Sequence, residues 1–362
     1  MKAEIVSGAV ITKRGIEDIS AIEIKEIINS EPKKNKCVLH FKSSRKGLCD
    51  LCYYGRSFTR VIELFGSFDF RNIDDIKNKL LKSEVKNFKA ESFAARCIKE
   101  SSNISSLDIE KIFGEYFNKK FKVRVNLENP QKTILIFVFE NQLYFGLDYA
   151  GFDLNKRDYR IFLHPAAIRG DVAYSMLRMA DYRPTDVLLD PFCGSGTIAI
   201  EAALFAINRA VHFYNRNKFS FLKFINYKFE EKEKDIKIKI FAYDALAHNI
   251  KSAEKNAKIA GVNKKITFSR TEVEWLDTKF KEKSVDKIVT NAPRITENNI
   301  KNIAKTFSEF FNNAAYILKK NGLIVIMTND PLFTKEKAKV ENFICLKEIT
   351  LNSLNILVFA QQ

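Results

Sequence analysis

One stretch of this chain, residues 187–203, restricts its fold more than any other. The stretch begins with an apolar run that has the length and branching of a buried strand. One proline and two glycines (Pro191, Gly194 and Gly196) then end the run, and Thr197 opens an apolar, alanine-rich helix. The sequence therefore predicts a strand, a glycine loop and a helix, a unit that lets backbone approach a bound ligand closely.

The loop between this strand and helix lacks the signatures of phosphate binding. It has no third glycine of the dinucleotide fingerprint, and no Gly-Lys-Ser/Thr follows it. Asp190, at the carboxyl end of the predicted strand, is suited to an amine or a hydroxyl rather than a phosphate. A nucleoside cofactor that carries an amino acid and no phosphate fits this loop better.

The charge of the chain points to a polyanionic partner. With 362 residues the chain is long enough for two or three domains, and its formal net charge is +16. Nucleic acid is the commonest soluble polyanion, so a nucleic-acid partner is favoured. The alternative is a lysine-rich composition that only solvates the surface.

Other features favour a cytoplasmic protein. No signal-peptide pattern and no apolar run of membrane length occur, and 6 cysteines in a chain this long suit a reducing compartment. Cys49 and Cys52 form a lone CxxC with no second metal-ligand pair at zinc spacing. We expect two buried thiols on a helix, with a redox or metal role as the alternative.

The first half of the chain reads as two small α+β units. In residues 1–80 the periodicity predicts strands at 5–11 and 37–41 and helices at 20–29, 56–65 and 74–85. In residues 81–163 it predicts a strand at 92–98, a capped helix at 106–117, strands at 122–127, 133–139 and 142–147, and a basic segment at 153–160.

The second half alternates strands and helices, which is typical of a parallel sheet. After an insertion at 213–234, the next predicted strand ends in Asp244, a carboxylate that can accept from both ribose hydroxyls of a nucleoside. The fourth strand leads into Asn291-Ala-Pro-Arg294. The segment 330–333 follows the fifth strand and is expected to be a loop, and a hairpin around 352–353 closes the chain.

Residues 190–197, Asp-Pro-Phe-Cys-Gly-Ser-Gly-Thr, resemble the first motif of S-adenosylmethionine (SAM)-dependent methyltransferases, in the form used by amino-group RNA methyltransferases. The resemblance implies that SAM is bound by Asp190, Phe192, Gly194, Ser195, Gly196, Thr197, Asp244 and Asn291. Glu272 falls where such enzymes place an acid that accepts the adenine amino group. The alternative for Glu272 is a surface acid.

A second resemblance covers the first half of the chain. Ser92-Phe-Ala-Ala-Arg96, Asn126–Pro130 and Gly151–Arg160 look like the THUMP domain, an RNA-binding module of tRNA-modifying enzymes that a ferredoxin-like unit commonly precedes. It implies RNA contacts by Lys156, Arg157, Tyr159 and Arg160, which can neutralise phosphates and stack on bases. A solvated turn is the alternative. His164-Pro-Ala resembles the family's linker to the methyltransferase domain, and we expect His164 to hold backbone rather than act as a base.

The loop at 291–294 carries the expected chemistry. Amino-group methyltransferases have Asn or Asp, two prolines and an aromatic residue there. The Asn side chain and a proline carbonyl accept the two protons of an exocyclic amine, whose lone pair then turns toward the methyl group, while the aromatic ring stacks on the base. Here Asn291 and Pro293 remain, Ala292 replaces the first proline, and Arg294 replaces the aromatic ring and can stack through its guanidinium. The catalytic candidates are Asn291, Pro293 and Arg294.

Together these features predict an α/β fold: a C-terminal Rossmann-like SAM methyltransferase domain after an α+β ferredoxin-like domain and a THUMP domain. The expected boundaries are 1–80 ferredoxin-like, 81–163 THUMP, 164–185 linker and 186–362 methyltransferase. The predicted function is methylation of tRNA, at guanine N2, by a monomer without metal or membrane. The alternatives are a catalytically inactive tRNA-binding paralogue that retains the SAM pocket, or an rRNA methyltransferase.

Overall fold

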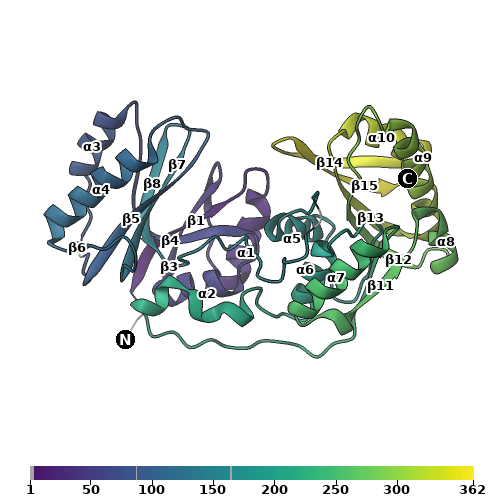
Figure 1. The fold of residues 1–362 in the computed structure, drawn as a ribbon, viewed down its shortest axis with the longest axis horizontal. Helices are drawn as coiled ribbons and strands as arrows, with labels where there is room; N and C mark the ends of the chain where they lie inside the picture. The colour runs from purple at the N-terminus through teal and green to yellow at the C-terminus, as the bar shows by residue number, and fades with distance from the viewer. Residues whose placement is uncertain (1–3, 87, 164) are drawn as a thin grey trace. The chain divides into compact units, whose positions relative to one another are not determined.

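The computed structural model describes residues 4–86, 88–163 and 165–362, and the chain divides into two compact units (Figure 1). The first unit comprises the chain up to Lys13 together with Ser20–Leu154 and Tyr214–Phe229. The second comprises Arg14–Ile19, Asn155–Phe213 and Glu230–Gln362. The chain therefore passes between the units several times.

The first unit is built on one mixed sheet in the order β2-β3-β1-β4-β8-β7-β5-β6. Its first half follows the β-α-β-β-α-β order of a ferredoxin-like fold. The elements are β1 (Ile5–Thr12), α1 (Glu17–Ile28), β2 (Lys33–Asn35), β3 (Val38–Ser44), α2 (Arg45–Tyr54) and β4 (Phe58–Asp69). Cys49 and Cys52 are buried on α2, which confirms the expectation of two buried thiols on a helix.

The helix predicted at 56–65 is wrong, because those residues enter β4. This strand lies between β1 and β8 and pairs antiparallel with both. Three consecutive residues of β4, Val61, Ile62 and Glu63, are buried, so both faces of the strand are covered there and its apolar residues do not alternate, which can imitate a helical period. The helix of this region is α2, directly before it.

The second half of the first unit adds α3 (Ile73–Leu81), β5 (Ser92–Glu100), α4 (Ser106–Phe121), β6 (Arg124–Val125), β7 (Lys132–Phe139) and β8 (Gln142–Asp148). Ser105, rather than Ser106, caps α4, accepting from the backbone N–H of Asp108. Ile76 and Leu80 of α3 share one buried cluster with Phe113 and Phe117 of α4. The two helices therefore share one part of the first unit's core.

The insertion expected within the methyltransferase half contributes Tyr214–Phe229 to the first unit. Its Ser220 N–H donates to the carbonyl of Ala150 at 3.0 Å, and Tyr227 donates to Asp50 at 2.6 Å. Gly151 has φ +83°, and a Cβ there would lie 2.8 Å from the Cβ of Ser220. Only glycine suits this position. The rings of Phe219, Phe221, Tyr227 and Phe229 pack together, and Tyr53 of α2 contacts two of them.

The second unit is a doubly wound sheet in the order β11-β10-β9-β12-β13-β15-β14. The strands from β11 to β13 are parallel, and β15 and β14 form the antiparallel hairpin that ends the chain. Its elements are α5 (Gly170–Met179), β9 (Val187–Asp190), α6 (Thr197–Ala206), β10 (Lys239–Asp244), α7 (Ala247–Ile259), β11 (Ile266–Arg270), α8 (Leu276–Lys279), β12 (Val285–Asn291), α9 (Ile300–Ile317), β13 (Leu318–Thr328), α10 (Pro331–Val340), β14 (Phe343–Leu351) and β15 (Leu354–Gln361).

Helices cover both faces of this sheet, with α5, α6 and α7 on one side and α8, α9 and α10 on the other (Figure 1). The strand order reverses between β9 and β12, whose neighbours β10 and β13 lie on opposite sides. Such a switch point opens a crevice at the carboxyl ends of the strands, where ligands bind in folds of this kind. The fold predicted for this half is confirmed.

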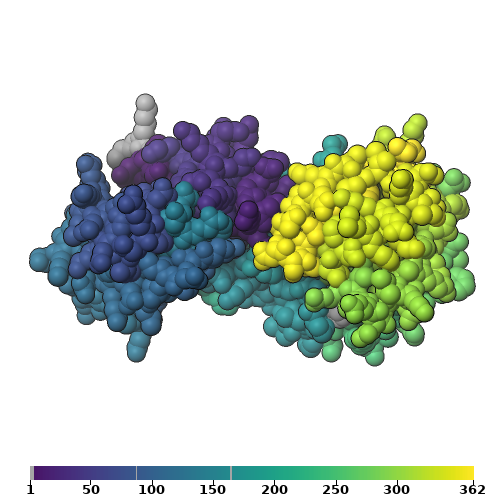
Figure 2. Space-filling view, turned by 90° about the horizontal axis from the view of Figure 1, so that it is seen from above, coloured from purple at the N-terminus to yellow at the C-terminus, as the bar shows by residue number. Residues whose placement is uncertain are grey.

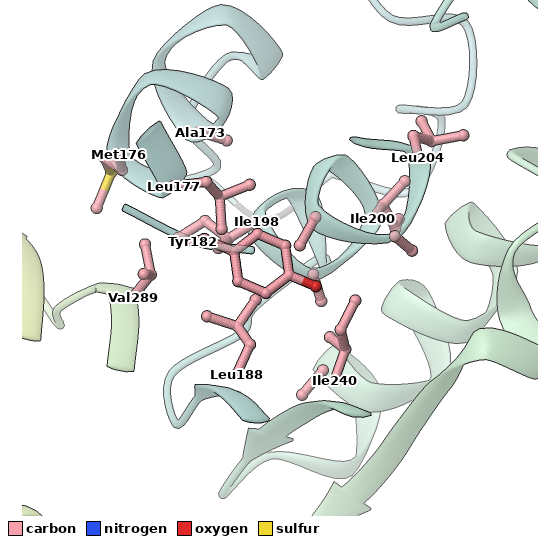
Figure 3. Close-up of a cluster of buried hydrophobic side chains, with 14 of the residues drawn as sticks. Ala173, Met176, Leu177, Tyr182, Leu188, Ile198, Ile200, Leu204, Ile240 and Val289 are labelled. Carbon is pink, nitrogen blue, oxygen red and sulfur yellow. The ribbon is translucent and has the colours of Figure 1, made fainter. Parts of the chain in front are cut away.

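The core under α5 and α6 holds the first strand in place. Figure 3 shows Ala173, Met176 and Leu177 of α5 and Ile198 of α6 around Leu188 of β9. The region predicted as a linker thus supplies part of this core.

The C-terminal hairpin, yellow in Figure 2, forms a continuous part of the second unit's surface.

The predicted loop at 330–333 is wrong, because Asp330 caps α10 and the helix begins at Pro331.

Candidate cofactor and substrate site

A pocket of about 440 Å³ lies at the switch point of the second unit. Nine of the residues predicted for the site line it, from the ends of β9, β10 and β12 and the loops that follow: Asp190, Phe192, Gly194, Ser195, Thr197, Asp244, Asn291, Pro293 and Arg294. The fold thus brings together residues that lie up to a hundred positions apart in the sequence.

Asp190 is the buried acid of this pocket, with 1% of its surface exposed. Its Oδ1 accepts a hydrogen bond from the Thr290 hydroxyl at 2.7 Å, and the carboxylate also accepts from the backbone N–H of Phe192. Burial raises the pKa of Asp190 to about 7, because these two hydrogen bonds compensate only part of the desolvation and Asp244 adds repulsion. A cationic ammonium group would supply the missing compensation.

Asp244 joins the end of β10 to the glycine loop. One carboxylate oxygen accepts from the backbone N–H of Gly194 at 2.9 Å. The other accepts from the N–H of Leu246 at 2.9 Å and from the side chain of Asn249 at 3.0 Å. These three bonds fix the carboxylate at the pocket wall and leave one lone pair, on the oxygen bound to Gly194, to which a hydroxyl of a vicinal diol can donate.

Two residues predicted to bind the cofactor, Gly196 and Glu272, are not among the described residues that line the pocket. Gly196 has φ +81°, and a Cβ there would lie 2.9 Å from the Cβ of Ala253, so this glycine lets α7 pack against the loop. Glu272 is exposed. For Glu272 the alternative of a surface acid fits this placement better.

The loop after β12 is held by side-chain amides. Asn291 donates through Nδ2 to the carbonyl of Ala166 at 3.0 Å. Both backbone groups of Ile295 bond to the amide of Asn329, at 2.9 and 2.8 Å. Asn299 donates to the carbonyl of Arg294 at 2.9 Å. The backbone is therefore fixed while the Arg294 side chain is exposed at the pocket.

Ala292, the departure from the expected motif, has a clear structural role. It is 7% exposed, and its N–H donates to the carbonyl of Met327 at 3.0 Å, which extends the pairing of β12 with β13. Proline has no N–H and could not make this bond.

The predicted RNA-binding cluster is divided by the structure. Lys156 is exposed and Arg160 is half-buried. Arg157 and Tyr159 are buried, and both bond to Glu201 of α6 at 2.8 Å. RNA contact by these two side chains is contradicted, because a buried ion pair with a satisfied hydroxyl cannot reach a phosphate or stack on a base. Their role is to fasten the start of the second unit to α6.

Several pocket residues were not predicted. These include Asn249, which donates to Asp244, and five others: Ala166, Ala167, Ile168, and Ile303 and Thr306 of α9. Apolar wall residues carry no chemical signal in a sequence. The one available signal was at Asn249, an amide five positions after the acidic end of a predicted strand, in the first turn of the helix that follows. His164 lies outside the described residues.

The described residues contain no cluster of three or more His, Cys, Asp or Glu side chains placed to hold a metal. Among those same residues no helix is both long and apolar enough to cross a membrane.

Comparisons with known proteins agree with this geometry. Residues 157–354 match the RMKL-like methyltransferase domain, and residues 70–148 match the THUMP domain. The chain is 30% identical to a tRNA (guanine(6)-N2)-methyltransferase of Methanocaldococcus jannaschii, over 91% of this chain and 92% of that protein. It is 26% identical to a protein of the same name from Archaeoglobus fulgidus, over 92% and 86% of the two chains. The structure of TrmN from Thermus thermophilus superposes with a TM-score of 0.70 at 20% identity, covering 99% of this chain and 100% of that one.

Proposed function

Because the chain belongs to the RMKL-like methyltransferase family and carries a THUMP domain, we propose that it methylates tRNA at the N2 amino group of a guanine, with SAM as methyl donor. Two relatives named tRNA (guanine(6)-N2)-methyltransferase, which align with most of this chain, support the substrate and the atom. The net charge of +16 supports a polyanionic substrate.

The residues of the pocket fit SAM. Asp190 is a buried carboxylate whose hydrogen bonds offset only part of its desolvation, and the ammonium group of the cofactor's amino acid would compensate the rest. Asp244 would accept from a ribose hydroxyl, and the glycine loop would let backbone approach the cofactor closely. When bound, SAM supplies a methyl group on a sulfonium that is ready for displacement.

The loop after β12, residues 291–299, which we call the acceptor loop, supplies the groups that an exocyclic amine needs. Asn291 lines the same pocket as Asp190, and the carbonyl of Ala166 holds its Nδ2. Its Oδ1 is therefore oriented to accept a proton of the guanine N2, with the carbonyl of Pro293 as the second acceptor. Attack of the amine nitrogen on the methyl carbon would form the new bond, the electron pair of the broken carbon–sulfur bond would stay on sulfur, and the surplus proton of the amine would pass to water. No metal and no covalent enzyme intermediate are needed.

Arg294 is proposed to hold the plane of the base. Its backbone is fixed through Asn299, and its exposed guanidinium can stack on a purine as the usual aromatic ring would. The proposal also includes a cytoplasmic, monomeric protein and RNA contact by Lys156 and Arg160. The domain boundaries given above remain predictions, as does a role for Glu272.

The observation that carries this proposal is the meeting of Asp190, Asp244 and Asn291 in one pocket. The test is incubation with tritiated SAM and unmodified tRNA transcripts, followed by nucleoside analysis. We expect label in N2-methylguanosine from tRNA and none from ribosomal RNA fragments. If SAM binds tightly in the presence of tRNA but no RNA is methylated, the protein is an inactive paralogue. If label appears only in ribosomal RNA, the protein is an rRNA methyltransferase.

A further inference from the structure

The side chain of Asn256, on α7, is a buried polar group that the proposed reaction does not use. It is 1% exposed, and all of its partners are backbone groups. Its Oδ1 accepts from the N–H of Ile161 at 3.2 Å and of Phe162 at 3.0 Å. Its Nδ2 donates to the carbonyl of Phe162 at 2.9 Å and of Ser195 at 3.0 Å. An amide has two acceptor and two donor positions, so this one is fully used.

These four bonds join two parts of the pocket. Ser195 belongs to the glycine loop. Ile161 and Phe162 begin what we call the rim segment, residues 161–163 and 165–168. Ala166, Ala167 and Ile168 of this segment line the pocket, and the carbonyl of Ala166 accepts from Asn291. Asn256 thus joins the glycine loop to the start of the rim segment, four positions before the carbonyl that holds the Asn291 side chain.

We propose that Asn256 is a positioning residue for methyl transfer: it sets the rim segment against the glycine loop and, through Ala166, orients the carboxamide of Asn291. This inference rests on the proposed function. With Nδ2 of Asn291 bound to Ala166, Oδ1 is presented to the amine, whereas a rotated amide would present N–H groups to an N–H donor. A shift of about 1 Å in such a group can reduce a rate about 100-fold.

The rim segment needs this support because apolar packing does little for its start. Ile161, Phe162 and Leu163 are 63%, 39% and 56% exposed. A segment whose apolar side chains face solvent is held mainly by its backbone bonds, and Asn256 makes three of these with Ile161 and Phe162. Loss of the amide would therefore release the rim segment more readily than it would unfold α7.

The variant Asn256→Asp separates these effects. It keeps the size of the side chain and an acceptor for Ile161 and Phe162, but it places an oxygen against the carbonyls of Phe162 and Ser195. The matched control is Asn313→Asp on α9. Asn313 is 7% exposed and donates to the backbone carbonyls of Val273 and Glu309, away from the pocket.

Three quantities are measured for both variants: the melting temperature, the Kd for S-adenosylhomocysteine, and the single-turnover transfer rate with saturating SAM and tRNA. We expect similar losses of melting temperature in both. We expect Asn256→Asp alone to lose at least about 30-fold in transfer rate, with a Kd raised by less than about 10-fold. Lowering the pH should partly restore the rate of this variant relative to wild type, because the introduced carboxyl group regains one donor when it is protonated.

Equal loss of transfer in the two variants would overturn the inference, since a purely structural amide would show that result. If Asn256→Asp does not fold, Asn256→Ser, which keeps a hydroxyl, takes its place with the same expectation. If the wild type itself transfers no methyl group, the proposed function fails instead. Amide hydrogen exchange then tests only whether Asn256 holds the rim segment. Faster exchange at Ile161 and Phe162 in Asn256→Asp supports this role, and unchanged exchange contradicts it.

Discussion

The two loops of the pocket differ in how they are held. The glycine loop, residues 190–197, is fixed by contacts at the ends of two adjacent strands, above all by Asp244 on the N–H of Gly194. The acceptor loop, residues 291–299, is held by Asn329, which follows the adjacent strand β13, and by Ala166, which lies outside the sheet and 125 positions from Asn291. Cofactor binding therefore rests mainly on contacts between neighbouring strands, whereas transfer also rests on a segment outside the sheet.

The sharpest way to separate the two loops is Asn291→Ala. We expect S-adenosylhomocysteine to bind within about threefold of wild type, and the transfer rate to fall by about 100-fold or more, the size typical of losing one group that stabilises a transition state. Single-turnover kinetics beside isothermal titration check this. An unchanged rate would show that the acceptor loop has another role.

The converse change is Asp190→Asn. It keeps the shape of a side chain that is 1% exposed but removes the charge that an ammonium group needs. We expect the Kd for SAM to rise about 100-fold, as for loss of a strong charge-assisted hydrogen bond. The melting temperature without ligand should not fall, because the buried charge is costly in the empty pocket. Wild-type affinity in this variant would remove Asp190 from the cofactor site.

The pH dependence gives a third comparison, because burial raises the pKa of Asp190 to about 7. Cofactor binding should weaken about tenfold for each pH unit below that value, as the carboxylate is protonated. Stability without ligand should change in the opposite sense. The folded pKa lies above the unfolded value of about 4, so the stabilising effect of protonation is complete at low pH and is lost as the pH rises through about 7. Both trends should vanish in Asp190→Asn, and their persistence there would assign them to another group.

The smallest effect is expected at Arg294, whose side chain is exposed. Arg294→Ala should raise the KM for tRNA about tenfold through loss of stacking, with little change in cofactor affinity. Arg294→Phe should recover most of this loss, whereas Arg294→Lys should not, because lysine keeps the charge but has no planar group. Recovery by lysine instead would indicate a phosphate contact.

These contrasts explain how much of the molecule could be predicted. The strand, glycine loop and helix at 187–203 could be predicted because three signals occur within a short stretch. They are the hydrophobic periodicity, the two glycines and the acidic residue at the end of the strand. The helix predicted at 56–65 was wrong because both faces of β4 are buried around Val61, Ile62 and Glu63, so the apolar residues there do not alternate. The loop predicted at 330–333 was wrong because the prediction relied on the position of this segment after the fifth strand. The capping signal of Asp330, which indicates the start of a helix, was not used.

The site shows the same division. Asp190, Asp244 and Asn291 could be placed at strand ends, and parallel strands bring such ends together. Arg157 and Tyr159 could not be assigned correctly, because a basic segment looks the same whether its charges face solvent or Glu201. The roles of Ala166 and Asn256 depend on backbone contacts that span 125 and 94 positions, which residue type alone does not reveal.

The central claim is that the methyl group goes to the exocyclic N2 of a guanine held by the acceptor loop. Once nucleoside analysis has located the methylated guanosine, a tRNA carrying inosine at that single position tests the claim, because inosine lacks the 2-amino group. The account predicts that this tRNA binds within about threefold of the unmodified one but accepts no methyl group. Methylation of the inosine would contradict the account and move the acceptor to another atom.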